Sequence, residues 1–161
     1  ATVSRAISQQ QAVRMTYQSL NSGTSERLVV PHSIINNGQC WHMRGYCLET
    51  SDFRDFVLGR IAKITVLDQR SEHTVTDDSK WNAVVKVRIQ AHPKLTPGQQ
   101  DLVRSEYFDG TAVRVHSCRG AMLPYLVQEL RLALDTTKEM PPEYQLAVEN
   151  VKEVRKWLFP A

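Results

Sequence analysis

Short runs in which apolar and polar residues alternate dominate the first 70 residues, and this period of two is that of β-strands. The runs are residues 13–18, 27–30, 41–48, 53–58 and 64–67. Turn-forming residues separate them: Pro31 ends the second run, and Asn37-Gly38 predicts a tight type I′ hairpin because both residues tolerate a positive φ. After a short lead-in helix or turn at residues 5–12, the pattern therefore predicts a small, strongly bent antiparallel sheet or barrel.

A polar stretch, residues 68–80, separates this region from a different pattern. Alternation returns at residues 83–89, and Thr96-Pro97 predicts the N-cap and first position of a helix that reaches Tyr107. A strand at 112–118 and helices at 121–134 and 143–158 complete the prediction, the helices from apolar residues at helical spacing. We therefore expect a mainly β unit at residues 1–70, a linker at 71–80 and a small α+β unit at 81–161.

The predicted strand at residues 41–48 is the most informative segment for function. Side chains of a strand alternate between its two faces. The apolar or small residues expected in the core are Trp41, Met43, Gly45 and Cys47. The alternate positions would place an imidazole, a guanidinium and a phenol in a row on the opposite face, at His42, Arg44 and Tyr46.

The distribution of charged residues is consistent with a binding role for His42, Arg44 and Tyr46 but does not identify that role. Residues 1–70 hold eight basic residues, seven of them arginine, against five acidic ones, and this excess equals the whole net charge of +3. The planar guanidinium suits two-point contact with phosphate or carboxylate, and aromatic rings offer stacking surfaces to bases. An anion or nucleotide pocket is one interpretation. The other is an ordinary polar sheet face on which Arg54 and Arg60 pair with Asp52 and Asp55.

Several classes of protein are not expected. No apolar run approaches the roughly 18 residues of a membrane span, so no membrane association is predicted. The three cysteines, Cys40, Cys47 and Cys118, lack the spacing of a zinc site and suit reduced thiols in a cytoplasmic protein. His92 and His116 have no matching ligand partners, and no nucleophile, phosphate-loop or metalloprotease motif is present. We therefore expect no enzyme, no cofactor and no metal site.

The segment around Trp41 resembles the WYL-domain family, bacterial transcription regulators named for a Trp-Tyr-Leu motif that here reads Trp41-His42-Met43. The family pattern R-x-F-x-x-x-R-I is matched by residues 54–61. The resemblance covers about residues 5–70, and residues 81–134 resemble more loosely the C-terminal extension that often follows a WYL domain.

This resemblance implies an SH3- or Sm-like β-barrel whose basic face binds a nucleic-acid or nucleotide-type effector. The positions it assigns to that ligand site are Tyr17, Arg27, His42, Arg44, Tyr46, Arg54 and Arg60. It also implies a homodimer and a winged helix-turn-helix that binds operator DNA, which residues 1–12 are too short to contain. The chain would then be the effector half of a longer repressor, of the sort that controls phage-defence operons. Direct binding of RNA or single-stranded DNA, and a pure dimerisation scaffold, remain alternatives.

Overall fold

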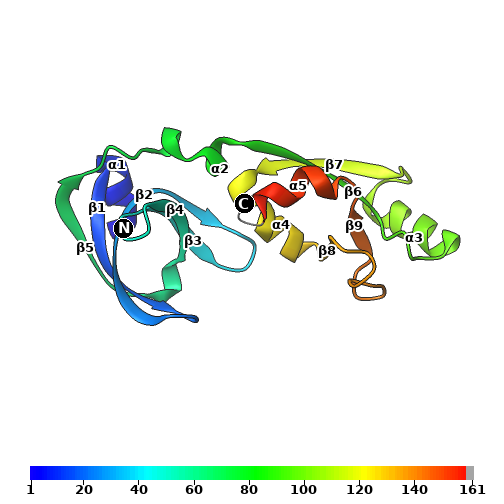
Figure 1. Ribbon diagram of the computed structural model, residues 1–161, viewed down its shortest axis with the longest axis horizontal. Helices are drawn as coiled ribbons and strands as arrows, with labels where there is room; N and C mark the ends of the chain where they lie inside the picture. The colour runs from blue at the N-terminus through cyan, green and yellow to red at the C-terminus, as the bar shows by residue number, and fades with distance from the viewer. Residues whose placement is uncertain (159–161) are drawn as a thin grey trace. The chain divides into compact units, whose positions relative to one another are not determined.

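The computed structural model describes residues 1–158 and divides the chain into two units, each described here by itself (Figure 1). Unit 1 comprises Ala1–Ser79, and unit 2 begins at Lys80. The boundary falls inside the polar segment 71–80. Within residues 1–158, no helix has the length and apolar character needed to cross a membrane.

Unit 1 is a five-stranded antiparallel sheet with one helix packed on it. Its elements are α1 (Thr2–Gln9), β1 (Gln11–Ser19), β2 (Gly23–Asn36), β3 (Trp41–Cys47), β4 (Asp52–Val57), the 3-10 turn η1 (Leu58–Arg60) and β5 (Ile61–Arg70). The spatial order of the strands is β4-β3-β2-β1-β5, so β3 lies between β2 and β4. Helix α1 contacts β1, β2 and β5, and its Ala6 is fully buried in the core with Val13, Met15 and Met43.

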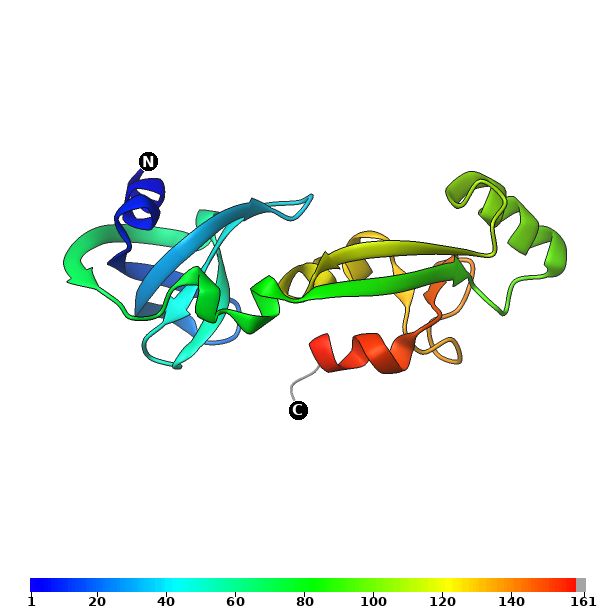
Figure 2. The same ribbon diagram turned by 90° about the horizontal axis from the view of Figure 1, so that it is seen from above.

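The five predicted strands and the lead-in helix are confirmed, but the SH3- or Sm-like barrel is not. Strands β4 and β5 form the two edges of the sheet, and no pairing joins them in the part of the chain that the structure describes. The sheet is strongly curved and remains open (Figure 2).

Two turn predictions are wrong in detail. Strand β2 continues through Pro31 because a bulge between Pro31 and Ser33 absorbs the residue that lacks an N–H donor. The β2–β3 hairpin exists, but residues 37–40 form a four-residue loop in which Asn37 donates to the carbonyl of Cys40. Only Gly38 has a positive φ there, +96°, whereas a type I′ turn needs two such residues.

Unit 2 is a four-stranded sheet flanked by short helices. Its elements are α2 (Ser79–Asn82), β6 (Val84–Ala91), α3 (Pro97–Tyr107), β7 (Val113–Arg119), η3 (Gly120–Met122), α4 (Leu123–Glu129), β8 (Leu132–Ala133), β9 (Leu146–Val148), α5 (Val151–Val154) and η4 (Arg155–Trp157). The strand order is β7-β6-β9-β8, with β8 and β9 parallel. Thr96 caps α3 as predicted, since its hydroxyl oxygen accepts a hydrogen bond from the N–H of Gln99.

The two C-terminal helices are confirmed only in part, because each is shorter than predicted. The helix expected at residues 121–134 is η3 and α4, which ends at Glu129, and Arg131 then takes a left-handed φ of +49°. The helix expected at residues 143–158 is replaced by β9, α5 and η4. Residues Leu146–Val148 are buried between two strands, and a short continuous apolar run cannot be assigned to helix or strand by its period.

Candidate functional site

The two faces of β3 have different neighbours. Met43 and Cys47 point into the core with β1, as expected, while His42 and Arg44 on the opposite face are also buried, at 1% and 6% exposure. Trp41, expected in the core, is 56% exposed because it opens the strand opposite Asn36, at the end of the hairpin. The opposite face of β3 is therefore not a solvated surface.

Four of the seven predicted site residues lie away from this buried face. Tyr17 is part of the core: its ring packs edge-on against Phe56 with centroids 5.2 Å apart, and its hydroxyl oxygen accepts the N–H of Val57. Arg54 lies two residues from Phe56, so it is on the same face of β4 as that core residue. It lies nearer the end of the strand, where its side chain is about half exposed and pairs with Asp52.

Arg27 and Arg60 complete this group. Arg27 is half-buried opposite Met15 of β1, and its Nε donates to the hydroxyl of Ser25. Arg60 lies in η1, outside the sheet. The expected pairing of Arg54 with Asp52 occurs, whereas Asp55 pairs with Arg44 rather than with Arg60.

The other three predicted residues, His42, Arg44 and Tyr46, follow one another along the buried face of β3. The guanidinium of Arg44 makes three hydrogen bonds to two carboxylates. Its Nε and Nη2 donate to the two oxygens of Asp78 at 2.6 and 2.9 Å, and its Nη1 donates to Asp55 at 3.1 Å. Asp55 is directly opposite Arg44 on β4, and Asp78 follows η2 (Val75–Asp77) in the polar segment.

Two imidazoles complete what we call the Arg44 cluster: Arg44, Asp55, Asp78, His32 and His42. The bulge after Pro31 directs His32 to this face, where its Nε2 lies 2.9 Å from Asp78. The Nε2 of His42 lies 4.0 Å from Asp55. The cluster therefore combines one permanent cation, two carboxylates and two imidazoles.

Burial and charge act in opposite directions on these groups. Burial lowers the pKa of Arg44, but the hydrogen bonds and charges of Asp78 and Asp55 outweigh it and raise the pKa above its ordinary value. The pKa of His42 is lowered because burial and the neighbouring Arg44 outweigh the attraction of Asp55. Arg44 is therefore charged and His42 neutral at pH 7.

Aromatic rings extend the site along β3. Tyr46 packs edge-on against Phe53 of β4, with centroids 5.3 Å apart. The ring of His73 stacks on Tyr46 with centroids 3.7 Å apart and 5° between the planes. Beside them is a cavity of about 220 Å³, lined by Ile7, Gln10, residues 30–32 and residues 73–75.

Besides Phe53 and Asp55 of β4, three further residues of this site were not among the predicted site residues: His32, His73 and Asp78. His73 and Asp78 lie in a segment without periodicity, and nothing in its composition distinguishes it from a linker. The bulge that reorients His32 depends on the pairing of β2 with β3. Neither the type of these residues nor their spacing in the sequence therefore predicts these contacts.

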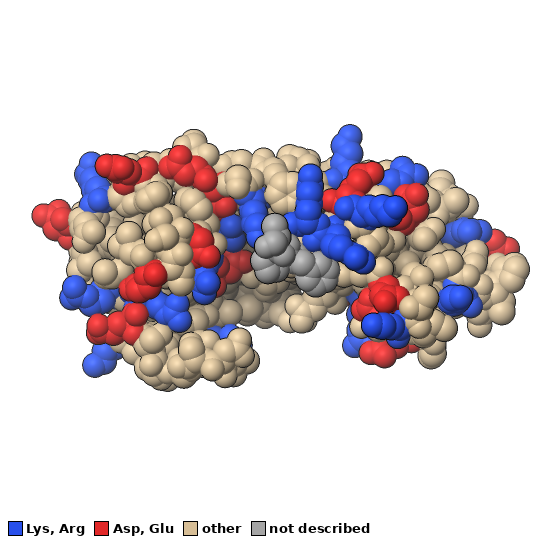
Figure 3. Space-filling view, viewed as in Figure 1, with Lys and Arg blue, Asp and Glu red and all other residues tan. Residues whose placement is uncertain are grey.

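The site is not the net cationic hollow that the excess of arginine suggests. Asp55 and Asp78 together outnumber Arg44 within the cluster, and Arg54 is paired with Asp52. On the face of unit 1 that Figure 3 shows, basic and acidic side chains are likewise interspersed. Selectivity for an anion would have to come from hydrogen-bond geometry rather than from a broad positive potential.

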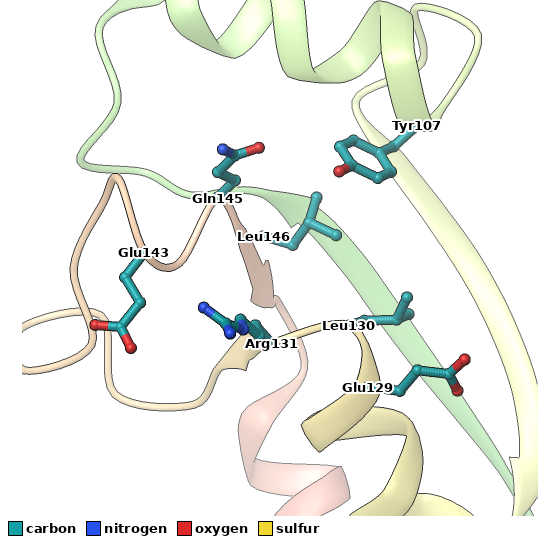
Figure 4. A pocket seen from close by; sticks show the side chains of 7 residues that line it. All are labelled: Tyr107, Glu129, Leu130, Arg131, Glu143, Gln145 and Leu146. Carbon is teal, nitrogen blue, oxygen red and sulfur yellow. The ribbon is translucent and has the colours of Figure 1, made fainter. Parts of the chain in front are cut away.

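Unit 2 contains a second cavity, of about 280 Å³ (Figure 4). Its lining comes from the end of α3, the end of α4 and the residues leading into β9: Tyr107, Glu129, Leu130, Arg131, Glu143, Gln145 and Leu146. The lining includes one arginine and two glutamates, and its one aromatic ring, Tyr107, has no stacked partner among the described residues of the lining. This cavity is therefore a weaker candidate than the site in unit 1 for binding an anion that carries an aromatic ring.

Comparison with known proteins assigns both units. The model of the WYL domain matches residues 1–66, and that of the BrxR transcriptional regulator, C-terminal dimerization domain, matches residues 84–154. The resemblance to WYL regulators is thus confirmed.

Similar proteins include the DNA-binding transcriptional repressor CapW of Pseudomonas aeruginosa, 35% identical over 153 residues that cover 94% of this chain and 50% of the repressor. CapW of Stenotrophomonas maltophilia is 34% identical over 161 residues, which cover 98% of this chain and 53% of that protein. The chain spans about half the length of these curated relatives.

Among solved structures, proteasome accessory factor B/C of Arthrobacter aurescens is similar with a TM-score of 0.41 and 17% identity, over 97% of this chain and 25% of that one. The sequence matches, rather than this likeness, carry the assignment. Residues 1–66 belong to the WYL-domain family, and residues 84–154 belong to the family of C-terminal dimerization domains named after the BrxR transcriptional regulator.

Proposed function

We propose that this chain is the effector-sensing and dimerisation region of a transcriptional repressor. The two domain matches and the similarity to repressors named CapW support this proposal. Operator DNA would be bound by a part of the longer protein that corresponds to the half of those relatives that this chain does not span. Ligand in unit 1 would then act by shifting the balance between two arrangements of the repressor. That the regulated genes are phage-defence genes stays a prediction of the resemblance.

The effector site we propose is the buried face of β3, where Arg44 and Tyr46 lie two residues apart. The observation that carries it is the two-point hydrogen bonding of the Arg44 guanidinium to an oxyanion, Asp78, beside a ring that is already stacked. A guanidinium next to a stacking ring is the arrangement that binds the phosphate and base of a nucleotide. The effector class is therefore an anion that carries a planar ring, a nucleotide or short oligonucleotide.

Titration of the protein with cyclic mononucleotides and short single-stranded oligonucleotides at low salt tests this site. Tyr46→Leu removes the stacking ring and keeps an apolar side chain, and we expect it to weaken binding about tenfold or more. Arg54→Ala is the matched control on the other side of the sheet and is expected to leave the affinity unchanged. Absence of binding to the wild type, or equal losses in the two variants, would refute the site.

Direct binding of RNA or single-stranded DNA is the alternative function. It predicts an affinity that rises with oligonucleotide length and falls steeply with the logarithm of salt concentration. Saturable binding of one mononucleotide per chain favours the sensor instead. The mixed charge around Arg44 favours the sensor as well, because a groove that tracks a nucleic-acid backbone is positively charged along its length.

We propose that unit 2 mediates dimerisation, which the match of residues 84–154 to a dimerization domain supports. We propose that a second copy of this chain docks on the groove between α3 and the loop before β9. The groove has a volume of about 560 Å³, and its lining includes Leu95, Leu102, Val103 and the pair Pro141-Pro142. Glu106 is the one charged residue among the described residues that line it, and interface cores are depleted in charge.

The competing surface is the outer face of β6 and β7, where Val84 and Val115 are exposed but share their face with Lys86, Arg88 and Arg119. Leu102→Asp, at a position 59% exposed, is expected to convert the dimer to monomer in light scattering. Val84→Asp, 71% exposed, is the matched control and is expected to leave the dimer intact. The reverse outcome would place the interface on the sheet.

A further inference from the structure

Residues 72–79, which we call the strap, lie over the buried face of β3. The strap was expected to be a linker, yet two of its side chains take up the two most distinctive groups of the proposed site. His73 stacks on Tyr46 with nearly parallel rings, and Asp78 binds Arg44 through both of its oxygens. An aromatic ring and an oxyanion thus reach β3 from one short segment.

These two contacts reproduce the chemistry of a bound nucleotide. A ring parallel to Tyr46 at 3.7 Å occupies the place where a nucleobase would stack. A carboxylate with its oxygens 2.6 and 2.9 Å from Nε and Nη2 of Arg44 occupies the place where a phosphate would be held by the same fork. In the strap the imidazole of His73 therefore takes the place of a nucleobase, and the carboxylate of Asp78 takes the place of a phosphate.

The strap is also suited to leave the site. Of its eight residues only Asp78 is buried, and His73 is exposed on the side away from Tyr46. Its turn is formed locally, since Thr74 and Asp77 make a reciprocal capping box. Segments with few buried groups open more readily than the core. In the strap the main cost of opening is the Asp78–Arg44 ion pair, which a bound phosphate would replace. The 220 Å³ cavity borders His73 and His32 and gives a ligand space beside the strap.

We infer that the strap is an internal mimic of the effector, and that a ligand with a planar base and a phosphate binds by displacing His73 from Tyr46 and Asp78 from Arg44. This inference rests on the proposed effector site and adds how that site is regulated. Ser79, at the end of the strap, immediately precedes unit 2. Release of the strap would free eight residues, about 26 Å of extended chain, between the two units.

Competition between strap and ligand has a definite consequence for affinity. The apparent dissociation constant is the intrinsic one divided by the fraction of molecules whose site is open. Weakening the strap must therefore tighten ligand binding, although each substitution removes a side chain from the protein. A strap that contributes contacts to the ligand predicts the opposite.

Calorimetric titration of the full chain with adenosine 5′-monophosphate tests the inference. We expect His73→Ala to tighten binding about threefold to tenfold, and Asp78→Asn to tighten it about tenfold or more. Glu72→Gln, an exposed acidic residue of the same strap, is the control for lost negative charge and is expected to change affinity less than about twofold. Because both contacts belong to the same strap, each of the two substitutions should also tighten the binding of adenosine and of inorganic phosphate.

Hydrogen exchange supplies a second measurement. The N–H groups of Asp77 and Asp78 are bonded to carbonyls within the strap, and we expect the nucleotide to accelerate their exchange. His73→Ala keeps the test decisive if Asp78→Asn does not fold, because the His73 ring is not part of the core. Equal affinities in all variants, or slower exchange in the strap, would overturn the strap inference and leave the effector site standing. No binding of any probe to any of the four proteins would overturn both.

Discussion

The buried guanidinium of Arg44 supports a quantitative prediction about stability. Arg44→Met keeps much of the side-chain length and removes the charge, so three hydrogen bonds to Asp78 and Asp55 are lost. Asp78 is then left as an unpaired carboxylate at 1% exposure. Breaking a buried ion pair on one side costs about 3–5 kcal/mol. Unit 1 has 79 residues, for which a typical total stability is about 4–12 kcal/mol.

The cost should come from the stranded carboxylate rather than from the lost contacts. The double variant Arg44→Met, Asp78→Leu removes both charges, and we expect it to recover most of the loss, ending within about 2 kcal/mol of the wild type. Asp55 keeps contact with water because its side chain is 20% exposed. The control is Arg54→Met, whose ion pair is about half exposed on both sides and is worth less than about 1 kcal/mol.

Urea unfolding followed by circular dichroism measures these differences. The reasoning is refuted if Arg44→Met costs less than about 1 kcal/mol. It is also refuted if the double variant is no more stable than the single one, because Asp78 would then not need its partner.

Three further predictions address single positions. In Gly45→Ala the new Cβ would lie 2.5 Å from the carbonyl oxygen of Val30, a backbone atom, and urea unfolding should report a loss of about 1–3 kcal/mol. Burial lowers the pKa of His42, so the unfolded chain takes up a proton at higher pH than the folded protein does. The free energy of unfolding should therefore fall as the pH drops below 6.5. If the free energy of unfolding of His42→Gln falls with the same slope, this reasoning is contradicted. Thr96→Ala removes the cap that binds the N–H of Gln99 and should lower the stability of unit 2 by about 1 kcal/mol, whereas Thr96→Ser should restore it.

Local patterns determined much of this protein before any tertiary contact is considered. Alternation along residues 13–18 and 41–48 predicted strands, because a half-buried strand repeats its environment every two residues. Thr96-Pro97 predicted the start of α3, because an N-cap and a proline at the first turn act within four residues of each other. The row of His42, Arg44 and Tyr46 on one face of β3 follows from the same alternation.

Tertiary structure alone decided what that face of β3 contacts. Asp78 is 34 residues from Arg44 and His32 is 46 residues from Asp78, and neither separation carries a periodic signal. Tertiary pairing likewise made Leu146–Val148 a strand, although their apolar run suits a buried helix equally well. The periodicity of apolar and polar residues along a strand or helix predicts which side chains share a face. Which carboxylate or ring then covers that face depends on the path of the chain through space, and here that path places Asp78 on Arg44 and His73 on Tyr46.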